Sequence, residues 1–306
     1  MWRRSPILFI KNSNPLVMAH RGDSANVPEN TKIAFRDAAE LDVDVIETDV
    51  HITADKKLVF FHDKKLERTT NGKGKITKKT LEELKSLDMG YKFDPEDEGN
   101  YPYRGKGLKI QTVPEILEKY PNMRFNMDIK DKVKDAPQHL ANVLKTFKAN
   151  KRVQVGSFHQ KQINKFRKYS DAPTSAGPIE TFKFWRTAKK WIKKHPNFMN
   201  QKNKALRKLD YTQQKIFGEE LAYVSLTVPM GFPLSKFNPW IKFVTPEIIK
   251  FAHLVNIAVF VWTINEKEHM KTLLDWNVDG IFTDKPALML SVLERIENQY
   301  NKEEKK

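Results

Sequence analysis

The stretch "VMAHRGDSANVPENTKIAFRDAAEL" (residues 17–41) decides the fold, because it joins an apolar run to a helical pattern through a polar turn. The run stops at His20 and Arg21, and from Thr31 onward apolar residues recur at three- and four-residue spacing. A buried strand followed by an amphipathic helix is the repeating unit of a parallel sheet. The stretch therefore predicts an α/β protein if the rest of the chain repeats the unit.

The chain does repeat it. Short apolar or β-branched runs occur eight times, at residues 16–20, 43–50, 123–130, 152–158, 172–177, 221–228, 257–264 and 278–284. The run at 172–177 is the weakest, and helical patterns fill most of the intervals. Eight such units predict an α/β fold in which eight parallel strands close into a (β/α)8 TIM barrel. An open, doubly wound sheet is the alternative, but no GxGxxG or Walker pattern follows the first run.

Two stretches are longer than ordinary connections. Residues 64–112 are rich in Gly, Pro and charge, and we expect a small insertion subdomain after His62, within a single domain that spans residues 1–306. Residues 180–215 include "FKFWRTAKKWIKKHPNF" (182–198), which mixes aromatic and basic side chains. That mixture fits an interfacial helix, and it fits equally a basic helix that packs on the barrel with a solvated outer face.

Composition limits the partners and the compartment. Lys and Arg number 54 against 38 Asp and Glu, and a net charge of +16 attracts anions such as nucleic acid, anionic lipid or small phosphates. The absence of cysteine excludes disulfides and thiolate metal sites. The apolar run Ile7 to Ile10 is too short for a signal peptide, and no run reaches the length of a membrane span. We therefore expect a cytoplasmic protein that makes peripheral contact with anionic membrane.

Active sites of parallel barrels form at the C-terminal ends of the strands. The expected ends carry side chains of catalytic types: His20, Arg21, Glu47, Asp49, His62, Asp63, Asp128 and Lys130. Glu47 and Asp49 are two residues apart on a strand, so their side chains point the same way. With Asp128 on a neighbouring strand they would repel one another, unless a hard divalent cation such as Mg2+ or Ca2+ binds their oxygens. The three carboxylates are therefore the predicted metal ligands.

A metal, two histidines and two cations suit a phosphate diester as substrate. The positive groups stabilise charge on the phosphoryl oxygens, while one imidazole removes a proton from the attacking hydroxyl or water and the other protonates the leaving alkoxide. His51 is expected to play no part, because its odd offset from Glu47 and Asp49 turns it to the opposite face of the strand. Any single carboxylate here could cap a helix or pair with a lysine, but the whole set is hard to explain in that way.

An ordered series of motifs between residues 17 and 286 resembles the glycerophosphodiester phosphodiesterase family. The motifs are "HRG", "PENT", "DVIETDVHIT", "HD", "RTTNGKG", "NMDIK", "VFVWTIN" and "VDGIFTDKP". The resemblance implies a (β/α)8 barrel that uses a divalent metal, Mg2+, Ca2+ or Mn2+. It also implies hydrolysis of small-molecule glycerophosphodiesters to an alcohol and glycerol 3-phosphate.

The family's functional positions can be transferred one by one to this sequence. They fall on His20 and His62 as general acid and base, Glu47 and Asp49 as metal ligands, Arg21 and Lys130 as phosphate contacts, Trp262 as pocket lining, and Glu29 and Asn30 as supporting residues. Asp128 departs from the pattern, because many members have a glutamate as third ligand at this place.

The "DIK" variant (128–130) resembles the branch that acts on lysophospholipids as a lysophospholipase D. Members of that branch also tend to carry an apolar, aromatic segment after the fifth strand, and residues 180–201 and "VPMGFPL" (228–234) match it. The resemblance therefore leaves two substrate classes, soluble glycerophosphodiesters and lysophospholipids.

Three other functions stay as alternatives. A sphingomyelinase D-type phospholipase on a related barrel shares the same residue types, but the "PENT" segment and the long insertion favour the first family. A basic nucleic-acid-binding protein would suit the net charge, yet the charge is scattered and no binding module is recognisable, so we expect no nucleic-acid partner. A catalytically inactive barrel is disfavoured because every polar residue that the mechanism needs is present.

Overall fold

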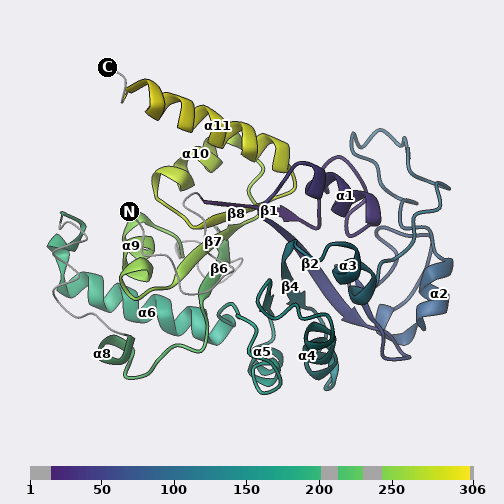
Figure 1. The fold of residues 1–306 in the computed structure, drawn as a ribbon, viewed down its shortest axis with the longest axis horizontal. Coiled ribbons are helices and arrows are strands. Elements are labelled where there is room, and N and C mark those ends of the chain that lie inside the picture. Colours follow the sequence, from purple (N-terminus) through teal and green to yellow (C-terminus); the bar gives the residue numbers. More distant parts are fainter. Residues whose placement is uncertain (1–14, 201–212, 230–242, 304–306) are drawn as a thin grey trace.

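The computed structural model describes residues 15–200, 213–229 and 243–303 of the chain. The N-terminal apolar run and most of "VPMGFPL" lie outside the described residues. Figure 1 shows a curled parallel sheet with helices packed around its outer side. None of the described helices is both long and apolar enough to span a membrane.

Seven parallel strands form the sheet, in the spatial order β5-β4-β2-β1-β8-β7-β6. They are β1 (Leu16–His20), β2 (Val45–Ile52), β4 (Arg124–Ile129), β5 (Val153–Gly156), β6 (Ser225–Pro229), β7 (Ala258–Trp262) and β8 (Gly280–Thr283). A short strand, β3 (Leu58–Phe60), pairs antiparallel with the end of β2 and lies off this path. Seven of the eight predicted runs are therefore strands.

The eighth predicted run, residues 172–177, is reduced to two bridging residues. Thr174 forms a parallel bridge with Val155 of β5, and Ser175 forms one with Ser225 of β6. The backbone amides of Val155 and Ser175 donate across the first bridge at 2.9 and 3.0 Å. The two residues thus connect the edges of the curled sheet and confirm the predicted barrel. A regular strand does not form here because Pro173 donates no hydrogen bond and a helix begins at Pro178.

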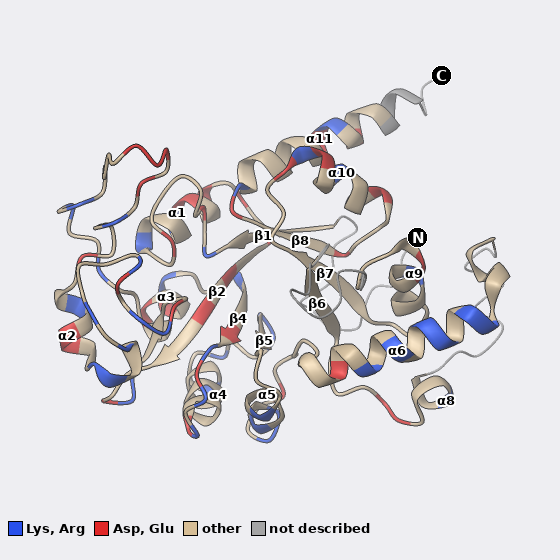
Figure 2. Ribbon diagram, turned by 180° about the vertical axis from the view of Figure 1, so that it is seen from behind, with Lys and Arg blue, Asp and Glu red and all other residues tan. Residues whose placement is uncertain are grey.

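Helices follow the strands along the chain, as the sequence pattern predicts. Those around the barrel are α1 (Lys32–Glu40), α3 (Val113–Lys119), α4 (Ala136–Thr146), α5 (Gln160–Phe166), α6 (Pro178–Lys194), α9 (Pro246–Leu254), α10 (Lys267–Asp275) and α11 (Pro286–Glu303). Shorter turns are η3 (Pro196–Asn200) and α8 (Gln213–Phe217). Figure 2, a view from behind, shows basic residues spread along α6.

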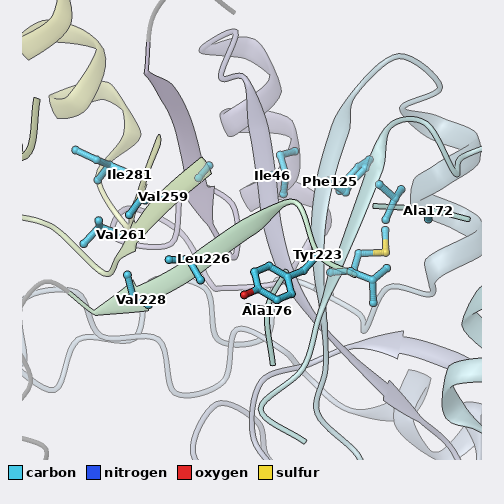
Figure 3. Close-up of a cluster of buried hydrophobic side chains, with 14 of the residues drawn as sticks. Ile46, Phe125, Ala172, Ala176, Tyr223, Leu226, Val228, Val259, Val261 and Ile281 are labelled. Atoms are coloured by element: carbon cyan, nitrogen blue, oxygen red, sulfur yellow. The ribbon is translucent and has the colours of Figure 1, made fainter. Parts of the chain in front are cut away.

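The core has two parts, one on each side of the sheet. Outside the barrel, side chains such as Ile46, Phe125 and Val259 pack between the strands and the helices (Figure 3). Inside it, an apolar cluster is formed by Leu16, Met18, Val45, Ala258, Phe260 and Phe282. Because β2 is covered on both faces, all eight of its residues are buried. The apolar cluster occupies the first part of the strands and leaves their C-terminal ends to polar side chains.

The insertion, residues 64–112, contains the 3-10 turn η2 (Ile76–Lys78) and the helix α2 (Leu81–Ser86). Leu66, Ile76, Leu84, Met89 and Ile110 form an apolar cluster with Val59 and Phe61 at β3. This cluster fixes the insertion beside the segment that carries His62. Its status as a separate subdomain stays a prediction.

Candidate active site

His20 ends β1 and lies opposite Glu47 of β2 in the sheet register. Its Nδ1 lies 2.6 Å from Oδ1 of Asp284, and its Nε2 lies 3.8 Å from Oε2 of Glu47. Burial by itself would lower the pKa of His20, but the charge of Glu47 and the hydrogen bond to Asp284 outweigh it and raise that pKa. The surroundings of His20 therefore favour its protonated form.

Asp284 follows β8, which neighbours β1 in the barrel. Asn265 Nδ2 donates to its Oδ2 at 2.6 Å, and Ser24 Oγ lies 2.9 Å from its Oδ1. Burial would raise the pKa of Asp284, but His20 and these hydrogen bonds lower it to about 2. Asp284 is thus a fixed anion that orients His20. The motif "VDGIFTDKP" contains this residue, whose role was not predicted, although a carboxylate at the end of the last strand was the available signal.

His62 lies beyond β3, and its partner is the next residue in the chain. Its Nδ1 lies 2.6 Å from Oδ1 of Asp63. Burial, together with the charges of Arg21 and Lys130, lowers the pKa of His62 and outweighs the opposite influence of Asp49 and Asp63. The environment of His62 therefore favours the neutral imidazole, the reverse of the situation at His20.

His51 supports this segment from the other face of β2. The His51 side chain is fully buried, its Nδ1 lies 2.8 Å from Oδ1 of Asp131, and its Nε2 lies 3.3 Å from the backbone oxygen of His62. This geometry agrees with the prediction that His51 points away from Glu47 and Asp49. Its contacts assign it to holding the backbone that carries His62.

Arg68, in the "RTTNGKG" motif of the insertion, joins two parts of the site. Its Nε donates to Oδ2 of Asp63 at 2.5 Å, and its two terminal nitrogens donate to Glu29 at 2.9 and 2.7 Å. Glu29 also accepts from Nη1 of Arg21 at 3.2 Å. Burial would raise the pKa of Glu29, but Arg68 and Arg21 keep it below its ordinary value. The role of Arg68 was not predicted, since its partners lie in other motifs.

The "HRG" turn directs Arg21 back across the strand ends. Arg21 has a positive φ of 59°, and its backbone amide donates to the backbone oxygen of Glu47 at 2.9 Å. A Cβ on Gly22, where φ is 86°, would lie 2.6 Å from the backbone of Ala34, so only glycine fits the turn. The Arg21 Nε lies 3.3 Å from Oδ2 of Asp49. The guanidinium is thereby held above the carboxylates of β2.

Asn30 of "PENT" supports the same carboxylate. Its Nδ2 donates to Oδ2 of Asp49 at 3.4 Å, and its Oδ1 accepts from Thr48 Oγ1 at 2.7 Å. Thr31, the next residue, caps α1 by accepting from the amide of Ala34. The loop therefore both starts a helix and positions Asp49.

Lys130, just beyond β4, bridges two of the predicted metal ligands. Its Nζ lies 2.7 Å from Oδ1 of Asp49 and 2.8 Å from Oδ2 of Asp128. Burial would lower the pKa of Lys130, but Asp128 and Asp49 raise it, so the ammonium keeps its charge. Gly156 lies opposite Asp128 in the register, and a Cβ there would come within 2.9 Å of Ser175 Oγ and 3.3 Å of Asp128. The absent side chain leaves room for the carboxylate.

The carboxylates fit a divalent cation in part. Burial and the charge of Asp49 raise the pKa of Glu47 to about 7, although His20, Lys130 and Arg21 act in the opposite direction. Their oxygens are the donors that Mg2+ and Ca2+ prefer. Asp49 and Asp128, however, are both engaged by Lys130, and the described residues contain no group of three acidic or histidine side chains that could hold an ion. Glu47 and Asp49 offer oxygen atoms of the right chemical kind, and the metal site formed by Glu47, Asp49 and Asp128 stays a prediction.

An aromatic pair borders the polar centre. Trp262 ends β7, and its ring lies 5.7 Å edge-to-face from that of Phe158, which follows β5. Phe158 is 59% exposed, and Lys130 Nζ lies 5.4 Å from the centre of its ring. Phe158 is the last residue of the predicted run 152–158, and a role in the site was not predicted for it. The structure places it with Trp262 as an apolar wall beside the ammonium of Lys130.

Fold and site together define a class of protein. A parallel barrel that gathers two imidazoles, a guanidinium and an ammonium at the C-terminal ends of its strands is arranged for an enzyme that acts on a phosphate ester. Each imidazole is oriented by a carboxylate, which is how proton-transferring histidines are commonly held.

Comparison with known proteins identifies the family within this class. The model of the glycerophosphoryl diester phosphodiesterase family matches residues 20–288. A glycerophosphodiester phosphodiesterase of Caldanaerobacter subterraneus subsp. tengcongensis is 30% identical over 92% of this chain and 98% of its own. Human lysophospholipase D GDPD1 is 23% identical over 90% of this chain and 85% of its own. The chain belongs to the glycerophosphoryl diester phosphodiesterase family, and it is a phosphoric diester hydrolase.

A solved structure shows the same fold. The phosphodiesterase of Oleispira antarctica, in complex with sn-glycerol-3-phosphate, matches with a TM-score of 0.63 at 21% identity and covers 92% of this chain and 97% of its own. The predicted resemblance and the predicted barrel are thus both confirmed.

Proposed function

We propose that this chain hydrolyses glycerophosphodiesters to an alcohol and glycerol 3-phosphate, with His20 and His62 as the proton-transferring groups. The observation that carries the proposal is their common geometry, in which Nδ1 of each imidazole lies 2.6 Å from a carboxylate oxygen. This leaves the Nε2 atoms for proton exchange with the substrate. The names of relatives and the glycerol 3-phosphate bound to the Oleispira enzyme support the choice of substrate.

In the proposed reaction, Arg21 and Lys130 contact the phosphoryl oxygens and stabilise the charge that develops on them. The neighbouring glycerol hydroxyl attacks phosphorus, its proton passes to one imidazole, and the bond to the leaving alcohol breaks as the other imidazole protonates that oxygen. Water then opens the cyclic phosphate by the reverse use of the same groups. A direct attack by water uses the same residues.

A divalent metal, Mg2+, Ca2+ or Mn2+, is part of the proposal. Glu47 and Asp49 would hold it, with Asp128 as the predicted third ligand. When bound, the ion would supply positive charge to the phosphoryl oxygens. The support is the chemistry and position of the donors, because Glu47 and Asp49 lie two residues apart on β2, so their carboxylates point the same way.

Lysophospholipids are the proposed second substrate class, cleaved in the manner of a lysophospholipase D to release the headgroup. The support is the aromatic wall of exposed Phe158 and partly buried Trp262, which would contact the glycerol backbone and acyl chain. The similarity to human lysophospholipase D GDPD1 points the same way. Access to such lipids would require peripheral contact with a membrane. Family membership disfavours the sphingomyelinase D-type and nucleic-acid-binding alternatives.

The test is a substrate panel of glycerophosphocholine and lysophosphatidylcholine, assayed with Mg2+, Ca2+, Mn2+ or chelator. We expect hydrolysis of glycerophosphocholine that chelator abolishes and one of the ions restores. Activity that ignores chelator would contradict the metal assignment, and the absence of hydrolysis with every ion would contradict the function itself.

A matched pair of variants tests the second substrate. Phe158→Ser should lower hydrolysis of lysophosphatidylcholine more than that of glycerophosphocholine, because only the lipid needs the apolar wall. Tyr169→Ser, at a residue 45% exposed just beyond α5, is the control and should change neither rate. Equal loss on both substrates in Phe158→Ser would contradict a lipid-specific role.

A further inference from the structure

Helix α6 has an inner face that packs firmly on the barrel. Phe184 and Ala188 are buried, and the Phe184 ring lies 5.5 Å from the rings of both Phe217 and Phe251. Trp191 lies 5.3 Å from the ring of Phe251 of α9. These aromatics therefore serve packing, as one of the two interpretations of the sequence predicts, and they fix which side of the helix faces outward.

The outer face of α6 consists of Ile179, Phe182, Lys183, Arg186, Lys189, Lys190, Lys193 and Lys194, all exposed. Ile179 is 68% exposed and Phe182 is 46% exposed. Lys183 pairs with Glu219 at 2.5 Å, and the other five cations have no carboxylate partner within the described parts of the chain. The face thus changes from apolar at Ile179 and Phe182 to cationic along the rest of the helix, where Figure 2 shows the Lys and Arg residues of α6.

The apolar end of this face lies beside the mouth of the barrel. Ile179 donates its backbone amide to Oε1 of Gln160 at 3.2 Å. Gln160 follows Phe158 by two residues, and Phe158 contacts Trp262 at the strand ends. The start of α6 is therefore linked through Gln160 to the segment that carries Phe158.

We propose that the outer face of α6 docks on an anionic phospholipid surface, with Ile179 and Phe182 in the interface and the cations against the headgroups. An exposed Ile and Phe gain by leaving water, and a row of unpaired cations gains by meeting negative headgroups. Docking in this way would bring the mouth of the barrel to the edge of the membrane. The substrate that the barrel would reach there depends on the proposed function, whereas the docking itself does not.

A polyanion such as nucleic acid is the less fitting occupant. The phosphates of a duplex would satisfy the cations, but its bases are stacked inside and present no apolar surface to Ile179 and Phe182. Lipid satisfies both halves of the face, because its acyl region and its headgroups lie a few ångströms apart.

The test is co-sedimentation of the full chain with vesicles of phosphatidylglycerol and phosphatidylcholine, compared with phosphatidylcholine alone. We expect binding to the anionic vesicles that falls as salt is added. The apolar pair Ile179→Ser and Phe182→Ser, and separately the triple change Lys189→Glu, Lys190→Glu and Lys193→Glu, should each weaken it at least tenfold.

Matched controls remove the same chemistry from other places. Tyr169→Ser removes an aromatic of nearly the same exposure as Phe182. The triple change Lys73→Glu, Lys78→Glu and Lys106→Glu removes three exposed cations of the insertion. Both should bind vesicles like the unchanged chain. Equal loss in the two lysine triples, or full binding by the apolar pair, would overturn the docking face and indicate attraction by net charge alone.

Hydrolysis of soluble glycerophosphocholine separates this inference from the proposed function. The α6 variants should keep that activity, because the soluble substrate needs no membrane. An unchanged chain that binds anionic vesicles but hydrolyses no diester would refute the proposed function and leave the docking face intact. A chain that hydrolyses the diester but ignores the vesicles would overturn the docking face alone.

Discussion

The two histidines of the site are held by carboxylates at the same distance but by different parts of the molecule. Asp284, which holds His20, comes from the opposite end of the chain and reaches it because β8 pairs with β1. Asp63, which holds His62, is the adjacent residue and is itself held by Arg68 of the insertion. The His20–Asp284 pair therefore depends on closure of the barrel. The His62–Asp63 pair depends on a local loop that Arg68 holds in place.

The surroundings also push the two imidazoles in opposite directions. The charge of Glu47 and the contact with Asp284 raise the pKa of His20 against burial, while at His62 burial prevails and lowers the pKa. Two groups with separated pKa values suit a reaction that needs both an acid and a base at one pH. His20 and His62 therefore differ in the direction of their pKa shifts, even though each has a carboxylate as its partner.

The largest expected effect comes from removing either imidazole. His20→Ala and His62→Ala should each lower kcat/KM for glycerophosphocholine by about 10²- to 10⁴-fold, because each removes a proton-transfer step. The double variant should lose little more than the worse single variant, since the two groups act as a unit. Thermal unfolding followed by circular dichroism should show that both single variants fold. Losses that multiply in the double variant would contradict joint action.

A smaller effect should follow from removing the orienting carboxylates. Asp284→Asn and Asp63→Asn each keep the shape of the side chain but lose its charge, so the imidazole is less firmly oriented. We expect about 10- to 100-fold losses in kcat with little change in KM. Steady-state kinetics at matched pH measures both. A loss confined to KM would show that these residues act in substrate binding.

A third and weaker effect should distinguish the two pairs. Arg68→Gln should lower kcat by up to about tenfold, because it releases Asp63 and Glu29. In the Asp63→Asn background, Arg68→Gln should lower kcat little further. In the Asp284→Asn background, it should lower kcat by the same factor as it does alone. Arg36→Gln, at an arginine half-exposed on α1 and paired with Asp37, is the control and should leave kcat unchanged. If Arg68→Gln had the same effect on kcat in both backgrounds, Arg68 would not act specifically through Asp63.

The smallest effect concerns stability. The pKa of Asp284 is lowered to about 2 in the folded chain, so its charged form stabilises the fold above its ordinary pKa, and that contribution disappears as pH falls towards 2. The difference in free energy of unfolding between the unchanged chain and Asp284→Asn should therefore be at most about 2 kcal/mol near pH 6 and should shrink between about pH 4 and pH 2. Urea unfolding over this range measures it. A difference that grows on acidification would reverse the sign of the contribution.

The barrel could be predicted because buried parallel strands produce continuous apolar runs between helical patterns. The fifth position shows the limit of this rule. Thr174 and Ser175 make only one bridge each, and two small polar residues leave no apolar run to recognise. The barrel closes at this position because Thr174 and Ser175 bridge to β5 and β6, and not because these residues themselves favour a strand.

The residues at the strand ends could also be predicted, because their position alone brings them together. Their partners could not. The contact between His20 and Asp284 spans 264 positions and exists only once the barrel closes, and Arg68 finds Glu29 and Asp63 through the anchoring of the insertion. Phe158 was hidden because an aromatic at the end of an apolar run is usually core, whereas here it is exposed beside Trp262.

The most direct test of the central claim is phosphorus NMR of the products formed from glycerophosphocholine by the unchanged chain and by the variant with both His20→Ala and His62→Ala. We expect glycerol 3-phosphate from the unchanged chain and no detectable product from the folded double variant over the same time. Phosphocholine as the product, or hydrolysis by the double variant at the unchanged rate, would contradict it.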